Sequence, residues 1–121
     1  MTELRYVMIF VSDLDRSIRF YRDVLQMAVS SQGRDMVEFR GPDGAEFTVH
    51  QAHLEGPHHH PPMVCGAVRL GFRVDDLDGA HARLMHAGAR CLTPPEEREG
   101  VRMGLYEDPD GLNFTLAQTL L

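Results

Sequence analysis

The chain has 121 residues, of which 43% are hydrophobic and 25% charged, a composition typical of one soluble globular domain. Its formal net charge of −6 argues against general binding to nucleic acids or anionic membranes, which requires a basic surface. No apolar run approaches the roughly 20 residues of a membrane-spanning helix, and the N-terminus lacks the layout of a secretory signal. We therefore expect a cytoplasmic protein, in which Cys65 and Cys91 are reduced packing residues.

The first half of the chain predicts a strand, a helix and three further strands. The segment from Leu4 to Val11 is rich in β-branched and aromatic residues and lacks Pro and Gly, which favours a strand. Ser12 or Asp13 can then cap a helix through a side-chain oxygen. The helix presents one apolar stripe, made of Leu14, Ile18, Tyr21 and Leu25. Short extended segments follow at roughly 27–31, 35–40 and 46–50.

Residues 53–62 are rich in Pro and His and have no periodicity, which indicates a linker. A histidine cluster overlaps it, made of His50, His53, His58, His59 and His60. The flanking prolines hold the triplet extended, so neighbouring side chains point apart and no preformed metal site is expected. We interpret the cluster as a solvated linker. Adventitious metal binding and contact with a ligand stay open as alternatives.

The second half repeats the same order of elements. A strand is predicted over 68–74, and Asp75 or Asp76 can cap the helix that follows. The apolar stripe of this helix consists of Leu77, Ala80, Leu84 and Ala87, with Gly88 as its C-terminal stop. His81 is expected at the edge of the stripe. Extended segments follow at roughly 90–92, 102–107 and 113–117.

Two short motifs show that the halves are copies of one unit. The motif from Val11 to Asp15 recurs from Val74 to Asp78, and the Pro-Asp-Gly turn ending at Gly44 recurs at Gly111. Because a single βαβββ module would bury too little apolar surface, we expect the two modules to pair. The prediction is an α+β fold in which two βαβββ modules form an open, eight-stranded, barrel-like cleft. One domain would span 1–121, with module 1 at about 1–52, a linker at about 53–63 and module 2 at about 64–121.

The VSDLDRSIRFYRDVLQM segment and the two Pro-Asp-Gly turns resemble the vicinal oxygen chelate superfamily. This superfamily includes glyoxalase I, extradiol dioxygenases, fosfomycin resistance enzymes and bleomycin resistance proteins. The resemblance covers nearly the whole chain and implies the paired-module fold, frequently as a homodimer. It also implies that the ligand or substrate is a small molecule held in the cleft.

In the metal-using members of this superfamily, each module supplies two metal ligands, usually His or Glu. The matching positions in this chain are Tyr6, Thr48, Arg69 and Thr115. Tyrosine and threonine are neutral at pH 7 and are poor ligands for divalent cations, and the fixed charge of arginine repels them. We therefore predict no metal and no cofactor. An irregular site made by His50 and Glu38 is the remaining alternative.

Strand alternation assigns side chains to the cleft face of each sheet. On this basis Phe10, Met36, Gly71, Arg73 and Leu105 are also expected there. The candidate ligand-binding residues are Tyr6, Met8, Glu38, Thr48, His50, Arg69, Met103 and Thr115. Methionines adapt to irregular apolar ligands, and an arginine with hydroxyl groups can orient a polar or anionic group. The alternatives are that the methionines belong to the core and that Arg69 pairs with an acid.

These expectations favour a metal-independent small-molecule-binding protein of the bleomycin-resistance type, which sequesters an antibiotic or metabolite without altering it. The alternative is a lyase, isomerase or dioxygenase of the same superfamily with a displaced or absent metal site. In that case Tyr6 or His50 would act in acid–base chemistry. Whether the protein is an enzyme is left open by the sequence. A structural or regulatory module has no positive feature in its favour.

Overall fold

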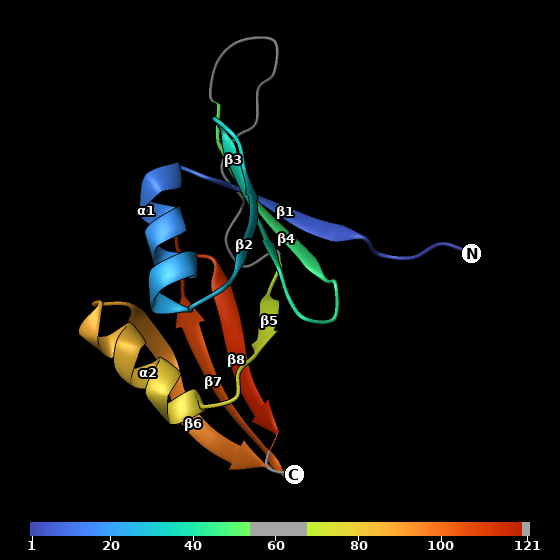
Figure 1. Ribbon diagram of the computed structural model, residues 1–121. Helices are drawn as coiled ribbons and strands as arrows, with labels where there is room; N and C mark the ends of the chain where they lie inside the picture. The colour runs from blue at the N-terminus through green and yellow to red at the C-terminus, as the bar shows by residue number, and fades with distance from the viewer. Residues whose placement is uncertain (54–67, 120–121) are drawn as a thin grey trace. The chain divides into compact units, whose positions relative to one another are not determined.

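The computed structural model describes residues 1–53 and 68–119. Most of the predicted linker, with His58, His59 and His60, and also Cys65, lies outside the described residues. The chain divides into two compact units, Met1–Met63 and Val64–Leu121. Each unit contains a helix and one four-stranded sheet (Figure 1).

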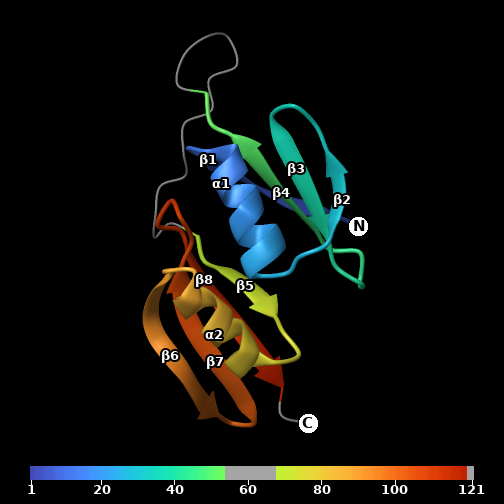
Figure 2. The same ribbon diagram turned by 60° about the vertical axis from the view of Figure 1, so that its left-hand side comes forward.

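The first unit has the predicted βαβββ order. Its elements are β1 (Tyr6–Val11), α1 (Leu14–Ile18), η1 (Arg19–Val24), β2 (Val29–Gln32), β3 (Met36–Arg40) and β4 (Glu46–Gln51). The strand order is β1-β4-β3-β2, with β1 parallel to β4 and the other pairs antiparallel. Figure 1 and Figure 2 show α1 lying against one face of this sheet.

The second unit repeats this topology. Its elements are β5 (Leu70–Arg73), α2 (Leu77–His86), β6 (Arg90–Arg98), β7 (Val101–Glu107) and β8 (Asn113–Thr119). The strand order is β5-β8-β7-β6, with β5 parallel to β8. Figure 2 shows α2 along one face of the sheet, and no other helix is found among the described residues of this unit, 68–119. The predicted α+β fold of two βαβββ modules is therefore confirmed.

Both helices begin with two hydrogen-bonded caps. The side chains of Asp13 and Asp76 accept bonds from first-turn backbone N–H groups at 3.1 and 3.0 Å, which settles both predicted pairs of alternatives. In addition, the side-chain oxygens of Gln51 and Gln118 accept from the N–H of the first helical residue at 2.8 and 2.7 Å. These glutamines lie on the last strand of each module. They therefore tie each helix start to its own sheet, a contact that no local motif indicates.

The first helix buries its predicted stripe although its winding changes. From Arg19 to Val24 the helix is of the wider π type, which alters the spacing of its turns. All the predicted apolar positions are nevertheless buried, namely Leu14, Ile18, Tyr21 and Leu25. No helix in the described part of the chain is long and apolar enough to span a membrane.

The second helix confirms three of its four predicted stripe residues. Leu77, Ala80 and Leu84 are fully buried. The prediction for Ala87 is wrong, because this residue is the C-terminal cap of α2 and is exposed. Gly88 follows with a φ of 79°, a left-handed conformation that suits glycine, and this confirms the predicted stop.

The strand β6 is much longer than predicted. The sequence predicts an extended segment over 90–92, whereas the strand continues to Arg98 through Pro94 and Pro95. It lies at the edge of its sheet, where a proline without an N–H is tolerated. The pairing of β6 with β7 shifts between Cys91 and Thr93 and again between Thr93 and Glu96. These irregularities accommodate the prolines and carry the strand past them.

Candidate functional site

The predicted site residues of the first module share one face of its sheet. Tyr6 is the first residue of β1, two residues before Met8. Met8 lies opposite Thr48, and Thr48 lies opposite Glu38. His50 is two residues beyond Thr48 and so points to the same side. Thr48 is only 3% exposed, whereas Tyr6 is 55% exposed. The other face of the sheet carries the buried core.

Local contacts orient His50. Its Nδ1 lies 2.8 Å from the backbone oxygen of Gln51, and its ring centroid lies 5.5 Å from that of Phe10 and 5.8 Å from that of His53. Because a carbonyl oxygen only accepts, Nδ1 donates this bond, and Nε2 is the unprotonated nitrogen of the neutral ring. Glu38 faces Thr48 across the ladder and is therefore diagonal to His50.

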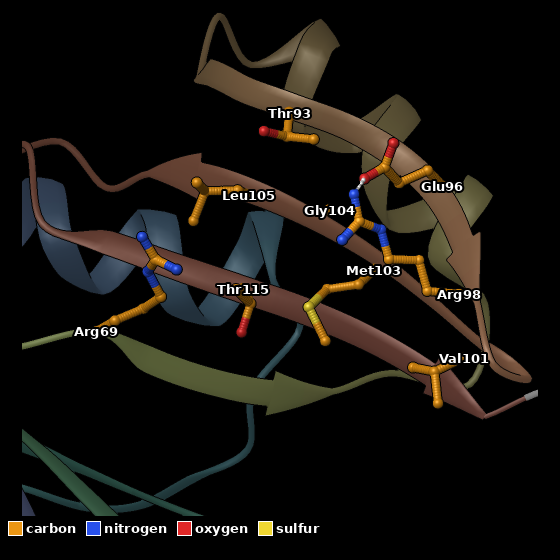
Figure 3. Close-up of a pocket in the computed structure, with 9 residues that line it drawn as sticks. All are labelled: Arg69, Thr93, Glu96, Arg98, Val101, Met103, Gly104, Leu105 and Thr115. Atoms are coloured by element: carbon orange, nitrogen blue, oxygen red, sulfur yellow. Dashed lines mark ion pairs between the residues drawn. The ribbon is translucent and has the colours of Figure 1, made fainter.

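The second module contains a pocket of about 250 Å³ on the sheet face away from α2 (Figure 3). Residues of β6, β7 and β8 line it, together with the residue just before β5. They are Arg69, Thr93, Glu96, Arg98, Val101, Met103, Gly104, Leu105 and Thr115. Three of the predicted site residues, Arg69, Met103 and Thr115, therefore meet in one place.

The pocket has charged ends and an apolar middle. Figure 3 shows Arg69 at one end and the ion pair between Glu96 and Arg98 at the other, with Leu105 and Met103 between them. The carboxylate of Glu96 lies 3.5 Å from the guanidinium of Arg98. Thr115 lies opposite Leu105 in the strand pairing and adds a hydroxyl group. Such a surface can hold an apolar group and orient a polar one.

Sequence reasoning misses the β6 side of this pocket. Thr93, Glu96 and Arg98 lie beyond the predicted end of the extended segment at Leu92. A signal was present, because Glu96 and Arg98 are two residues apart and so share a strand face. Leu105 was assigned to the correct face but was not among the candidate ligand-binding residues.

The side chains at the four positions that match the metal ligands of the resembled superfamily do not suit a divalent metal ion. Tyr6 and Thr48 lie on the first sheet, and Arg69 and Thr115 line the pocket of the second. A phenol, two hydroxyls and a guanidinium supply neither imidazole nor carboxylate, which such a cation prefers. Within residues 1–53 and 68–119, no group of three or more His, Cys, Asp or Glu side chains is arranged to hold a metal ion.

A polar pair lies beneath the pocket, between α2 and the sheet. The hydroxyl of Tyr106 and Nδ1 of His81 are 2.9 Å apart and share a hydrogen bond. Tyr106 is completely buried and stacks on Phe114 at a centroid distance of 5.7 Å. Burial raises the pKa of Tyr106 to about 12, and the charges of Cys91 and Asp78 add to the effect. His81, expected at the edge of the stripe, thus joins the helix to the sheet.

Cys91 is half-buried, and burial raises the pKa of its thiol, opposed by a hydrogen bond from the backbone of Thr93. A raised pKa lowers the thiolate fraction at neutral pH, so this cysteine is a poor nucleophile. The position fits the predicted packing role for Cys91.

Alkaline pH should destabilise the protein through Tyr106. Its pKa is about 12 in the folded chain, against an ordinary value of 10.0. Below pH 10 the phenol is neutral in both states, and its contribution to stability is complete. As pH rises from 10 to 12, the unfolded chain ionises first, so the free energy of unfolding falls. Urea unfolding across this range should show that the free energy of unfolding falls more steeply with pH for the wild type than for Tyr106→Phe. An equal fall in both proteins would contradict the raised pKa of Tyr106.

Comparisons with known proteins agree with this architecture. The sequence model of the Glyoxalase/Bleomycin resistance protein/Dioxygenase superfamily matches residues 3–116. The chain is 28% identical to the uncharacterised protein YaeR of Escherichia coli (strain K12), over 96% of this chain and 95% of that protein.

Solved structures show the same fold. A protein of unknown function from Agrobacterium tumefaciens str. C58 superposes with a TM-score of 0.80 at 25% identity, over 99% of this chain and 96% of that one. A glyoxalase/bleomycin resistance protein from Albidiferax ferrireducens T118 gives a TM-score of 0.76 at 23% identity, over 95% of this chain and 97% of that one. Because the superfamily model spans nearly the whole sequence, the chain belongs to the Glyoxalase/Bleomycin resistance protein/Dioxygenase superfamily.

Proposed function

We propose that this chain is a metal-independent small-molecule-binding protein that sequesters its ligand without altering it. The observation that carries the proposal is the pocket on the second sheet, where Arg69 and Thr115 stand beside the apolar side chains of Met103 and Leu105. Apolar walls with a few polar groups are typical of small-molecule sites. The donor chemistry at the four family positions supports the metal-independent form of the proposal.

Each part of the pocket has a role in this proposal. Met103 and Leu105 bury the apolar part of the ligand, which removes its surface from water. Arg69 and Thr115 orient its polar end through hydrogen bonds. On the first sheet, Tyr6, Met8, Glu38, Thr48 and His50 form a second candidate ligand-contacting surface. The protein is further proposed to act as a homodimer.

The test combines ligand binding with recovery of the ligand. Tag-free protein is screened against a panel of aromatic compounds and antibiotics by backbone amide NMR, and each bound compound is then extracted and analysed. We expect shifts at Leu105, Met103 and Thr115, recovery of the compound unchanged, and weaker binding by Met103→Ala. The matched control is Met85→Ala, since Met85 is similarly exposed, at 38% against 44%, but lies on α2.

Three results would overturn the proposal in different ways. Conversion of the bound compound would assign an enzymatic activity instead, and loss of turnover in His50→Ala would then place catalysis on the first sheet. Near-stoichiometric divalent metal that survives dialysis against a weak chelator would refute metal independence. Equal weakening of binding by Met85→Ala and Met103→Ala would mean that the ligand does not occupy this pocket.

A further inference from the structure

Among the residues that the structure describes, the pocket on the second sheet carries a positive charge without a partner at one end only. At the far end, Arg98 is paired with Glu96 at 3.5 Å. At the near end, no residue that the structure describes forms a hydrogen bond or an ion pair with the guanidinium of Arg69. The field along the pocket therefore favours a ligand whose negative charge lies at the Arg69 end.

The nearby acid on this face already has a partner. The strand pairing places Glu107 opposite Asn113, at the end of β8 from which Arg69 approaches. The carboxylate of Glu107 lies 3.8 Å from the guanidinium of Arg90 on β6. Arg90 lies on β6, which pairs with β7 on the side away from β8 and β5. The ion-pair partner that the structure gives Glu107 is therefore Arg90 and not Arg69.

Gly71 leaves space beside the hydroxyl of Thr115. The two residues pair across β5 and β8, and a Cβ added at Gly71 would lie 3.3 Å from Oγ1 of Thr115. In the first module the same ladder position holds Met8, opposite Thr48. At this position of the repeat, the first sheet carries the methionine side chain and the second sheet carries no side chain. A longer side chain at position 71 would stand next to Thr115, where a ligand must approach.

The size of the pocket favours a small ligand. The pocket holds about 250 Å³, below the roughly 300–1,000 Å³ of sites for drug-sized molecules. Its walls offer the guanidinium of Arg69, which has no partner among the described residues, and the hydroxyls of Thr93 and Thr115. A guanidinium pairs well with a planar carboxylate, which accepts two parallel hydrogen bonds.

We propose that the ligand is a small organic monoanion whose carboxylate binds Arg69 and Thr115 and whose apolar body lies along Leu105 and Met103, with Gly71 as the residue that admits it. This inference rests on the proposed function and specifies its ligand class. In this proposal Arg69 selects ligands by their negative charge, and Gly71 selects them by size, because it leaves room beside Thr115.

Three probes of nearly equal shape and different charge test the charge selection: phenylacetate, phenylacetamide and 2-phenylethylammonium. Binding is measured at pH 7 from the amide shifts of Leu105 and Thr115. Phenylacetate should bind at least about tenfold more tightly than phenylacetamide, as expected for a charge-assisted hydrogen bond, and the ammonium should bind most weakly. Arg69→Gln should remove this preference. Arg73→Gln is the matched control, because Arg73 is an exposed arginine four residues further along the chain that does not line the pocket.

The steric selection is tested by Gly71→Met, which copies Met8 of the first module. This variant should lose binding of all three probes while its amide spectrum remains that of a folded protein. Gly71→Ala is the second variant, for use if Gly71→Met does not fold, and it should weaken binding partially. Equal binding of the three probes by the wild type, or an unchanged preference in Arg69→Gln, overturns the monoanion inference and leaves the proposed function standing. Absence of binding by every probe overturns the monoanion inference, whereas the proposed function is decided separately by the broader compound panel. Full binding by Gly71→Met refutes the role of Gly71.

Discussion

Replacing Gly104 with alanine is expected to lower the free energy of unfolding by about 2–3 kcal/mol, although the change adds only a methyl group. A Cβ at this position would lie 2.6 Å from the Tyr106 hydroxyl oxygen and 2.8 Å from its ring. The ring cannot move aside easily, because Tyr106 is fully buried and stacked on Phe114. The clash would also strain the hydrogen bond to His81. Chemical denaturation monitored by circular dichroism measures the loss.

A double-mutant cycle separates the clash with Tyr106 from other causes of the stability loss in Gly104→Ala. Tyr106→Phe removes the atom nearest to the new methyl group, so it should make Gly104→Ala less costly than in the wild-type background. Gly33→Ala is the control, because a Cβ there would meet its nearest neighbour, in Met36, at an ordinary 3.6 Å. Additive effects of the changes at positions 104 and 106 would contradict the proposed steric conflict.

The Gly104 environment shows which parts of the fold the repeat could predict. The helical pattern of the sequence predicts His81 at the edge of the apolar stripe of α2, and Tyr106 on β7 is its partner in the structure. It could not indicate that the two meet, because they are 25 residues apart and belong to different elements. The first module has Ile18 and Phe39 at the corresponding places, both buried and apolar. The topology therefore follows from the repeat, whereas this polar pair is particular to the second copy.

The pocket was predictable only on the strands with regular alternation. Arg69, Met103 and Thr115 were assigned to the correct face because side chains alternate along β7, β8 and the approach to β5. The contributions of β6 were missed because the strand passes through two prolines and two shifts of register. After such a shift, the face of a residue depends on its partner in β7, and a local pattern no longer gives it.

The second large effect is expected at Asp108, which begins the Pro-Asp-Gly turn of the second module. Its carboxylate accepts hydrogen bonds from the backbone N–H groups of Asp110 at 2.9 Å and Leu112 at 2.8 Å, and the residue is only 5% exposed. Asp108→Ala removes the acceptor and leaves these N–H groups without it in a buried turn. Since each such group costs about 1–3 kcal/mol, we expect a loss of about 2–4 kcal/mol, measured by urea denaturation.

The matching turn of the first module provides the control. There the position of Asp108 is held by Gly41, and the carboxylate of Asp43 accepts one exposed bond from the backbone N–H of Ala45 at 3.2 Å. Asp43→Ala should therefore cost only a few tenths of a kcal/mol. Asp108→Asn keeps one oxygen acceptor without the charge, so its effect should fall between those of the two alanine variants. If Asp108→Ala and Asp43→Ala were equally mild, the buried carboxylate would not be what holds β7 and β8 together at this turn.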